Sequence, residues 1–206
     1  MTSTFAMSES LLATLTAEPW SFDPDSVRPV QIRFNEDGTG ELLCFIEFHV
    51  FLAVELDWKL LGPAPTERKI SISGSSPTTP TQLAEMEMEI TLTKRLHPLL
   101  RKAGPSSLPT AERWFAEEAF QTKRFTVHLQ QGRFPAPTQL DVGSASDWQR
   151  FSLRLVLDPS VFPPYSEWNS PDEAPAAYQF WQWKEFCSRE LPDTALARIQ
   201  EKCVLM

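Results

Sequence analysis

The fold of this chain is decided by residues 28–60, which read RPVQIRFNEDGTGELLCFIEFHVFLAVELDWKL. Val30, Ile32 and Phe34 alternate with polar residues, as in a strand with one buried face. The Asp37-Gly38 step that follows favours a tight hairpin, because glycine readily adopts the positive φ that such turns need. The segment therefore predicts a strand over residues 28–34 and a hairpin into the next strand.

The return arm of this hairpin has an apolar side chain at every even position: Leu42, Cys44, Ile46, Phe48, Val50, Leu52, Val54, Leu56, Trp58 and Leu60. Strict period two indicates β structure. A straight strand of this length would span roughly 60 Å at ~3.3 Å per residue, whereas a globule of this size is about 40 Å across. The arm must therefore bulge or reverse near residues 49–52, as the strands of barrels and strongly curved sheets do.

Outside this segment the sequence predicts further strands at residues 68–73, 84–94, 123–130 and 150–157. Helices are expected at residues 8–15, 110–120, 176–190 and 193–202, and a proline-rich surface loop at residues 158–175. The predicted fold is mainly β, an antiparallel meander that forms a lipocalin-like barrel or a strongly curved sheet. We expect one domain over residues 1–206: a lead-in (1–27), the β region with its inserted helix (28–157), and the loop with two C-terminal helices (158–206).

The bulk composition favours an intracellular protein that does not bind nucleic acid. The net charge is −8, and no run of lysine and arginine offers phosphate contacts. The 3 cysteines are widely spaced, unlike a disulfide framework or a metal clip. No signal peptide is recognisable at the N-terminus, and no apolar run approaches the ~20 residues of a membrane span. The expected localisation is cytoplasmic, with no metal and no cofactor, and the oligomeric state stays open.

The order Trp20, a strand ending at Phe34, the Asp37-Gly38 turn and a return strand reaching Trp58 resembles the start of calycin and lipocalin-like barrels. In those proteins a tryptophan closes the base of the barrel before the first hairpin. The same stretch, residues 20–60, is also similar to small proteins of filamentous fungi. The glycine of the lipocalin Gly-x-Trp motif is replaced here by Glu18. The resemblance implies a barrel that holds a small apolar ligand in its mouth or interior.

The first functional hypothesis is therefore a binding module for a small hydrophobic molecule. Methionine and aromatic side chains on the expected inner face suit an irregular apolar ligand. The candidate binding residues are Phe48, Trp58, Met86, Met88, Phe125 and Phe151. Ordinary core packing among the same side chains is the competing interpretation.

The second hypothesis is a lipocalin-like cyclase or isomerase of secondary metabolism. Glu47 and His49 lie two apart on one strand and project the same way, so they form a candidate acid/base pair. A solvated polar face explains the same two residues. No nucleophile elbow and no phosphate-binding loop supports an enzyme, and His97 and His128 are expected to be structural.

The third hypothesis is a membrane- or partner-docking protein. The last four residues, Cys203-Val204-Leu205-Met206, fit the C-a-a-X pattern for a farnesyl group on Cys203. One lipid without a polybasic segment gives only reversible, peripheral membrane association. In the predicted helix over residues 176–190, Ala176, Phe180, Trp183 and Cys187 form one apolar stripe. Tyr178 and Trp181 fall outside it, where they suit a lid over a cavity or a partner surface.

Overall fold

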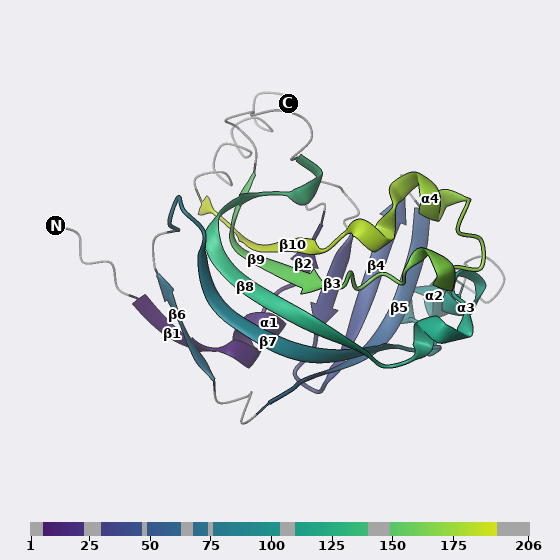
Figure 1. Ribbon diagram of the computed structural model, residues 1–206, viewed down its shortest axis with the longest axis horizontal. Helices are drawn as coiled ribbons and strands as arrows, with labels where there is room; N and C mark the ends of the chain where they lie inside the picture. The colour runs from purple at the N-terminus through teal and green to yellow at the C-terminus, as the bar shows by residue number, and fades with distance from the viewer. Residues whose placement is uncertain are drawn as a thin grey trace.

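A closed antiparallel barrel forms the body of the protein (Figure 1). The computed structural model describes residues 6–22, 30–46, 49–62, 68–73, 76–103, 110–139 and 149–192. The strand order around the barrel is β10-β2-β3-β4-β5-β7-β8-β9, so neighbours in the barrel follow one another along the chain and β10 closes it between β9 and β2. The barrel strands are β2 (Trp20–Ser21), β3 (Gln31–Phe34), β4 (Thr39–Ile46), β5 (His49–Leu60), β7 (Thr81–Leu92), β8 (Lys123–Pro135), β9 (Arg150–Asp158) and β10 (Glu185–Glu190). The predicted mainly β fold and antiparallel meander are confirmed.

The hairpin between β3 and β4 forms as the sequence predicts. Phe34 pairs with Gly40, and Gly38 has a φ of 84°, the left-handed region that glycine adopts at little cost. The Asp37 carboxylate accepts hydrogen bonds from the Thr39 N–H at 2.9 Å and from the Thr39 hydroxyl at 2.6 Å. Local turn chemistry thus sets the register between β3 and β4.

The long alternating run is split into two paired strands. Ile46 pairs with His49, so the chain reverses between these residues, just before the predicted position. Cys44 pairs with Leu52 but Phe45 pairs with Val50, which leaves Phe51 as the extra residue of a β-bulge. The bulge changes which side chains of β5 point into the barrel. Phe51 belongs to the main core, whereas Val50 and Ala53 pack with Leu43 in a separate outer cluster.

One end of the barrel is covered by α1 (Leu11–Thr16). Ser10 caps this helix by accepting the Ala13 N–H, and Leu11 and Leu15 are buried in the main core. Trp20, fully buried, donates its indole N–H to the Leu15 carbonyl at 3.0 Å. The first barrel strand is therefore fastened to the helix that covers this end.

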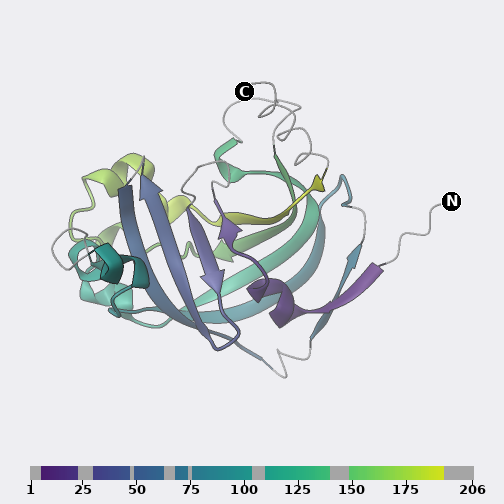
Figure 2. The same cartoon turned by 180° about the vertical axis from the view of Figure 1, so that it is seen from behind.

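The strand at residues 68–73 lies outside the barrel, contrary to its predicted place in the meander. β6 (Lys69–Ser73) pairs with β1 (Ala6–Ser10) in a separate two-stranded sheet. Gln131 of β8 joins this ribbon to the barrel, since its side chain bonds both the N–H and the carbonyl of Ser73. Figures 1 and 2 show the ribbon projecting from the side of the barrel near the N-terminus.

Short helices gather at the other end of the barrel, opposite α1 (Figures 1 and 2). They are α2 (Pro98–Ala103), α3 (Ala111–Trp114), η1 (Glu117–Phe120), η3 (Tyr165–Glu167), α4 (Ala174–Tyr178) and η4 (Phe180–Gln182), while η2 (Pro137–Gln139) follows β8 elsewhere. The predicted mid-chain helix over residues 110–120 is present only as α3 and η1, because Phe115 is extended and bridges Trp168. None of the helices in the described ranges has the length and apolarity to cross a membrane.

The predicted helix over residues 176–190 is wrong. α4 ends where Gln179 takes a left-handed conformation, and residues 185–190 form the closing strand β10. The edges of β9 and β2 need a hydrogen-bonding partner, and this pairing prevails over a helical pattern of aromatic residues. The predicted helix over residues 193–202 lies outside the described residues.

A pocket beneath an aromatic cap

Residues 159–184, here called the capping segment, cover the end of the barrel opposite α1. The sequence predicted a surface loop over residues 158–175, but Ser160, Val161, Phe162 and Trp168 are all buried. The prolines interrupt helices and strands in this segment, but the side chains between them are still able to be buried. The segment therefore contributes buried side chains to the core, although Tyr165 and Tyr178 stay exposed.

Phe180 lies at the centre of the capping segment and is fully buried. Its ring stacks on Phe51 of β5 and on Phe162, with centroids 5.3 Å apart in both pairs. It also contacts the rings of Trp168, Tyr178 and Trp183. Aromatic pairs at these separations add to the stability that burial provides. The cap is thus a packed aromatic cluster that joins the end of the barrel wall.

Hydrogen bonds to the helical region also fasten the capping segment. The Asn169 amide lies within 3.0–3.2 Å of the carbonyls of Glu112, Arg113 and Phe115. The Ala116 N–H donates to the Glu167 carbonyl, and the Asn169 N–H donates to the Trp114 carbonyl. These bonds order the loop between α3 and β8 against the cap.

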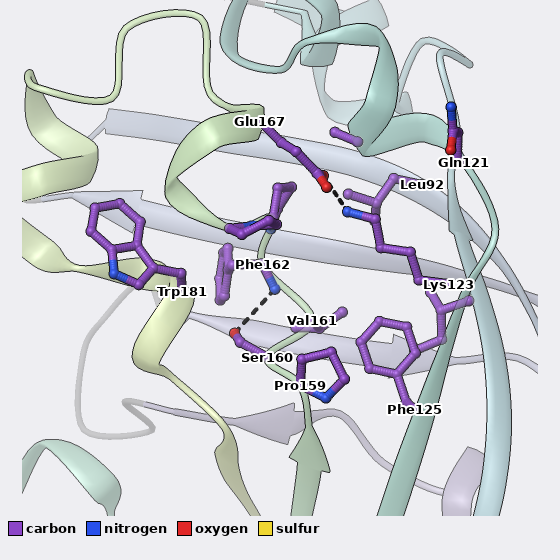
Figure 3. Close-up of a pocket in the computed structure, with 14 residues that line it drawn as sticks. Leu92, Gln121, Lys123, Phe125, Pro159, Ser160, Val161, Phe162, Glu167 and Trp181 are labelled. Atoms are coloured by element: carbon purple, nitrogen blue, oxygen red, sulfur yellow. Dashed lines mark hydrogen bonds and ion pairs between the residues drawn. The ribbon is translucent and has the colours of Figure 1, made fainter.

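A pocket of about 290 Å³ lies between the capping segment and the barrel wall (Figure 3). Its wall comes from β7, β8, η1 and the cap: Ile90, Leu92, Ala119, Gln121, Lys123, Phe125, Pro159, Ser160, Val161, Phe162, Pro163, Pro164, Glu167 and Trp181. Most of these side chains are apolar, which is the usual composition of a small-molecule site. The volume lies just below the range of about 300–1,000 Å³ that is typical of drug-sized ligands, so a one- or two-ring molecule fits.

The polar groups of the pocket are few. The ammonium of Lys123 and the carboxylate of Glu167 form an ion pair at one side of it, with side chains 27% and 17% exposed (Figure 3). The Ser160 hydroxyl is engaged within the cap, since it donates to the Trp183 carbonyl at 2.6 Å and accepts the Phe162 N–H at 3.2 Å. Polar contact with a bound molecule therefore falls to Lys123, Glu167 and the exposed Gln121.

The candidate binding residues are distributed over several places. Phe125 lines the pocket beneath the cap, and Met88, fully buried, packs in the main core. Met86 lines a second, more open pocket of about 530 Å³ beside Leu60 and Arg68. Trp58 donates its indole N–H to the carbonyls of Asn35 and Thr39, at the hairpin end of the barrel.

Phe151 packs with Phe134, Ala136 and Cys187 in a small cluster apart from the main core. Phe48 lies outside the described residues. The five candidates that the structure describes therefore do not surround one shared space. Val161 and Phe162 were missed because residues 158–175 were interpreted as a surface loop, and the density of aromatic residues after Pro159 was the available signal. Trp181 was expected in a helix, where it was considered as part of a lid over a cavity, and it does line the pocket.

Side chains occupy the middle of the barrel. The fully buried members of one continuous cluster there include Ile32, Leu42, Val54, Leu56, Val127, Leu129, Leu153, Leu155 and Phe186. Eight strands enclose an interior that is just wide enough for side chains to fill or for one small ligand. Among the described residues, those that line the pocket beneath the cap form an apolar enclosure of the kind that a ligand needs.

The histidines take separate positions. His49 is exposed, and Glu47, its predicted partner, lies outside the described residues. His97 is buried: its Nε2 lies 2.9 Å from Glu41 Oε2, and its Nδ1 accepts the Leu99 N–H at the start of α2. His128 lies on β8 near Glu85 and Gln82. His97 therefore links Glu41 of β4 to the start of α2.

The cysteines and acidic residues of the described part of the chain form no metal site. Cys44 and Cys187 are free and buried, and burial raises the pKa of the Cys187 thiol to about 12. Cys203, the expected farnesylation site, lies outside the described residues, so its modification stays a prediction.

Comparison of the chain with known protein families, curated proteins and solved structures finds no match. The closed eight-stranded antiparallel barrel is the feature that the chain shares with calycin-like architecture.

Proposed function

We propose that this protein binds a small, largely apolar molecule in the pocket beneath its aromatic cap. The observation that carries the proposal is the pocket of about 290 Å³ with mostly apolar walls at the end of a closed barrel. The likeness to calycin-like barrels supports it, since such barrels take ligands at the mouth. A two-ring ligand that buries about 200 Å² of apolar surface gains about 5 kcal/mol, which corresponds to a Kd on the order of 0.1 mM.

The test is a titration with naphthalene and 2-naphthol, followed by the fluorescence of Trp181 and its neighbours and by calorimetry. Saturable binding of at least one of these compounds is expected. In Ala119→Phe the added ring fills the pocket, because Ala119 lines it and is buried, so binding is lost. Gln121→Trp gives a second variant, since Gln121 lines the same pocket but is exposed, and its replacement does not disturb the core.

Leu61→Phe is the matched control, because Leu61 lines the second pocket instead. It adds an aromatic ring without touching the cap and is expected to bind like the parent chain. The proposal fails if neither compound binds, or if Ala119→Phe and Gln121→Trp, both folded by circular dichroism, bind as the parent chain does.

The cyclase or isomerase alternative requires a proton-transfer pair facing the ligand. Of the described residues that line the pocket, Lys123 and Glu167 are the two with ionisable side chains, and they form an ion pair with each other. Enzymatic turnover and membrane docking through Cys203 both stay predictions.

A further inference from the structure

The ion pair at the side of the pocket retains hydrogen-bonding capacity on both partners. A lysine ammonium has three N–H donors, and a carboxylate has two acceptor oxygens. Within the ranges that the structure describes, the Lys123 ammonium bonds Glu167 Oε2, and Glu167 Oε1 has no protein donor. Donors and an acceptor are therefore available side by side at the edge of an apolar pocket.

The charges of this pair cancel where a ligand would meet them. Because the two groups are in contact, a ligand anion drawn to Lys123 also meets the Glu167 carboxylate, and a ligand cation drawn to Glu167 also meets the Lys123 ammonium. Both side chains are mostly shielded from solvent, so the repulsion is screened less than on an open surface. The remaining lining groups are apolar or, like Gln121, neutral.

A hydroxyl group matches this arrangement, because it donates one hydrogen bond and accepts others. It donates to Glu167 while it accepts from Lys123, without disturbing the pair. The rest of such a molecule faces Phe125, Val161 and Phe162, which close the opposite side of the pocket (Figure 3). We propose that the ligand of this pocket is a small neutral molecule, an apolar one- or two-ring body that carries a hydroxyl group. This inference rests on the proposed function of the same site.

Three probes of one shape test the proposal: naphthalene, 2-naphthol and 2-naphthoate at pH 7, titrated by calorimetry. A hydrogen bond to a charged group predicts that 2-naphthol binds about tenfold or more tightly than naphthalene. The 2-naphthoate anion is expected to bind more weakly than 2-naphthol. If naphthalene binds as tightly as 2-naphthol, the hydroxyl preference is wrong although the binding function stands; if no probe binds, the proposed function itself fails.

Substitutions of the pair give a sharper readout. Glu167→Gln leaves Lys123 without its carboxylate, so the affinity for 2-naphthoate should rise by about tenfold while naphthalene binds as before. The double variant Lys123→Met with Glu167→Met removes both charges and keeps the volume, so 2-naphthol should lose its advantage over naphthalene. Unchanged naphthalene binding shows in each case that the pocket is intact.

Glu117→Gln is the matched control for these variants. Glu117 forms a lysine ion pair with Lys94 at 2.5 Å that does not line the pocket. Its replacement should leave the order of the three probes unchanged. An unchanged 2-naphthoate affinity in Glu167→Gln would overturn the assignment of the pair as the polar contact of the ligand.

Discussion

The ring of Phe180 in the capping segment stacks on the ring of Phe51 in β5, with centroids 5.3 Å apart and planes inclined by 25°. This contact depends on the bulge at Phe51, which brings an odd-numbered side chain of β5 into the main core. Without the extra residue, Phe51 would share the outer face with Ala53. The bulge in β5 therefore places Phe51 where it forms the barrel's side of the contact with the capping segment.

Phe180→Ala should strongly destabilise the protein, because it empties the centre of the aromatic cluster. Removal of a fully buried phenylalanine costs about 3–5 kcal/mol in free energy of unfolding. Denaturant unfolding measures the change. Tyr178→Ala is the control, since Tyr178 stacks on Phe180 but is 42% exposed and should cost much less. Equal effects of the two variants would contradict the central position of Phe180.

Gly40→Ala should destabilise the first hairpin by about 2–3 kcal/mol through steric overlap. A Cβ at Gly40 would lie 2.3 Å from the Arg33 carbonyl oxygen and 2.8 Å from Leu56 Cδ1. Gly38→Asn is the comparison, since asparagine tolerates the positive φ at this turn better than other residues with a side chain. Thermal unfolding should show Gly40→Ala to be less stable than Gly38→Asn. The reverse order would show that the strands around Gly40 shift to make room for the added Cβ.

Glu41 should make the stability of the protein depend on pH in the acid range. The hydrogen bond from His97, helped by the nearby Arg33 guanidinium, holds the pKa of Glu41 below its ordinary value of 4.5, against the opposite effect of partial burial. A carboxyl with a lowered folded-state pKa stabilises the protein above its ordinary pKa. This contribution is lost as the pH falls through the folded-state value.

The difference in unfolding free energy between the parent chain and Glu41→Gln should therefore be about 1 kcal/mol at pH 7 and should shrink below pH 4.5. Denaturant titrations at several pH values measure it. Glu118→Gln, at an exposed position of η1, controls for the loss of one negative charge. A difference that stays constant from pH 7 down to acid denaturation would show that the charge of Glu41 contributes nothing.

Cys44 and Cys187 should resist alkylation in the folded protein. Both are buried, burial raises the pKa of both thiols, and the thiolate is the reactive form. With iodoacetamide at pH 8, peptide mass spectrometry should find both unmodified until guanidinium unfolds the chain. The same digest separates them from Cys203. Rapid native labelling of either cysteine would mean that its part of the barrel opens readily.

The features of the fold that depend on residues close together in the sequence could be predicted. The Asp37-Gly38 turn needs only local backbone geometry, and the period-two runs of β4, β5, β7 and β9 indicate strands with one buried face wherever they pair. The pocket was harder to predict: Phe125 was identified from its strand and Trp181 was considered as part of a lid, but Val161 and Phe162 lie in a segment whose prolines indicated a surface loop. Prolines interrupt hydrogen-bond ladders, yet they do not determine whether nearby side chains are buried.

The sequence alone establishes that this protein is mainly β, because its apolar residues alternate with polar ones and a strand buries such a pattern on one face. The closure of the barrel is a property of the assembled sheet. Residues 185–190 become β10 rather than helix because the open edges of β9 and β2 meet around the barrel and require backbone partners. The site likewise needs the three-dimensional arrangement, since Lys123 and Glu167 are far apart along the chain and meet only when the cap folds over the end of β8.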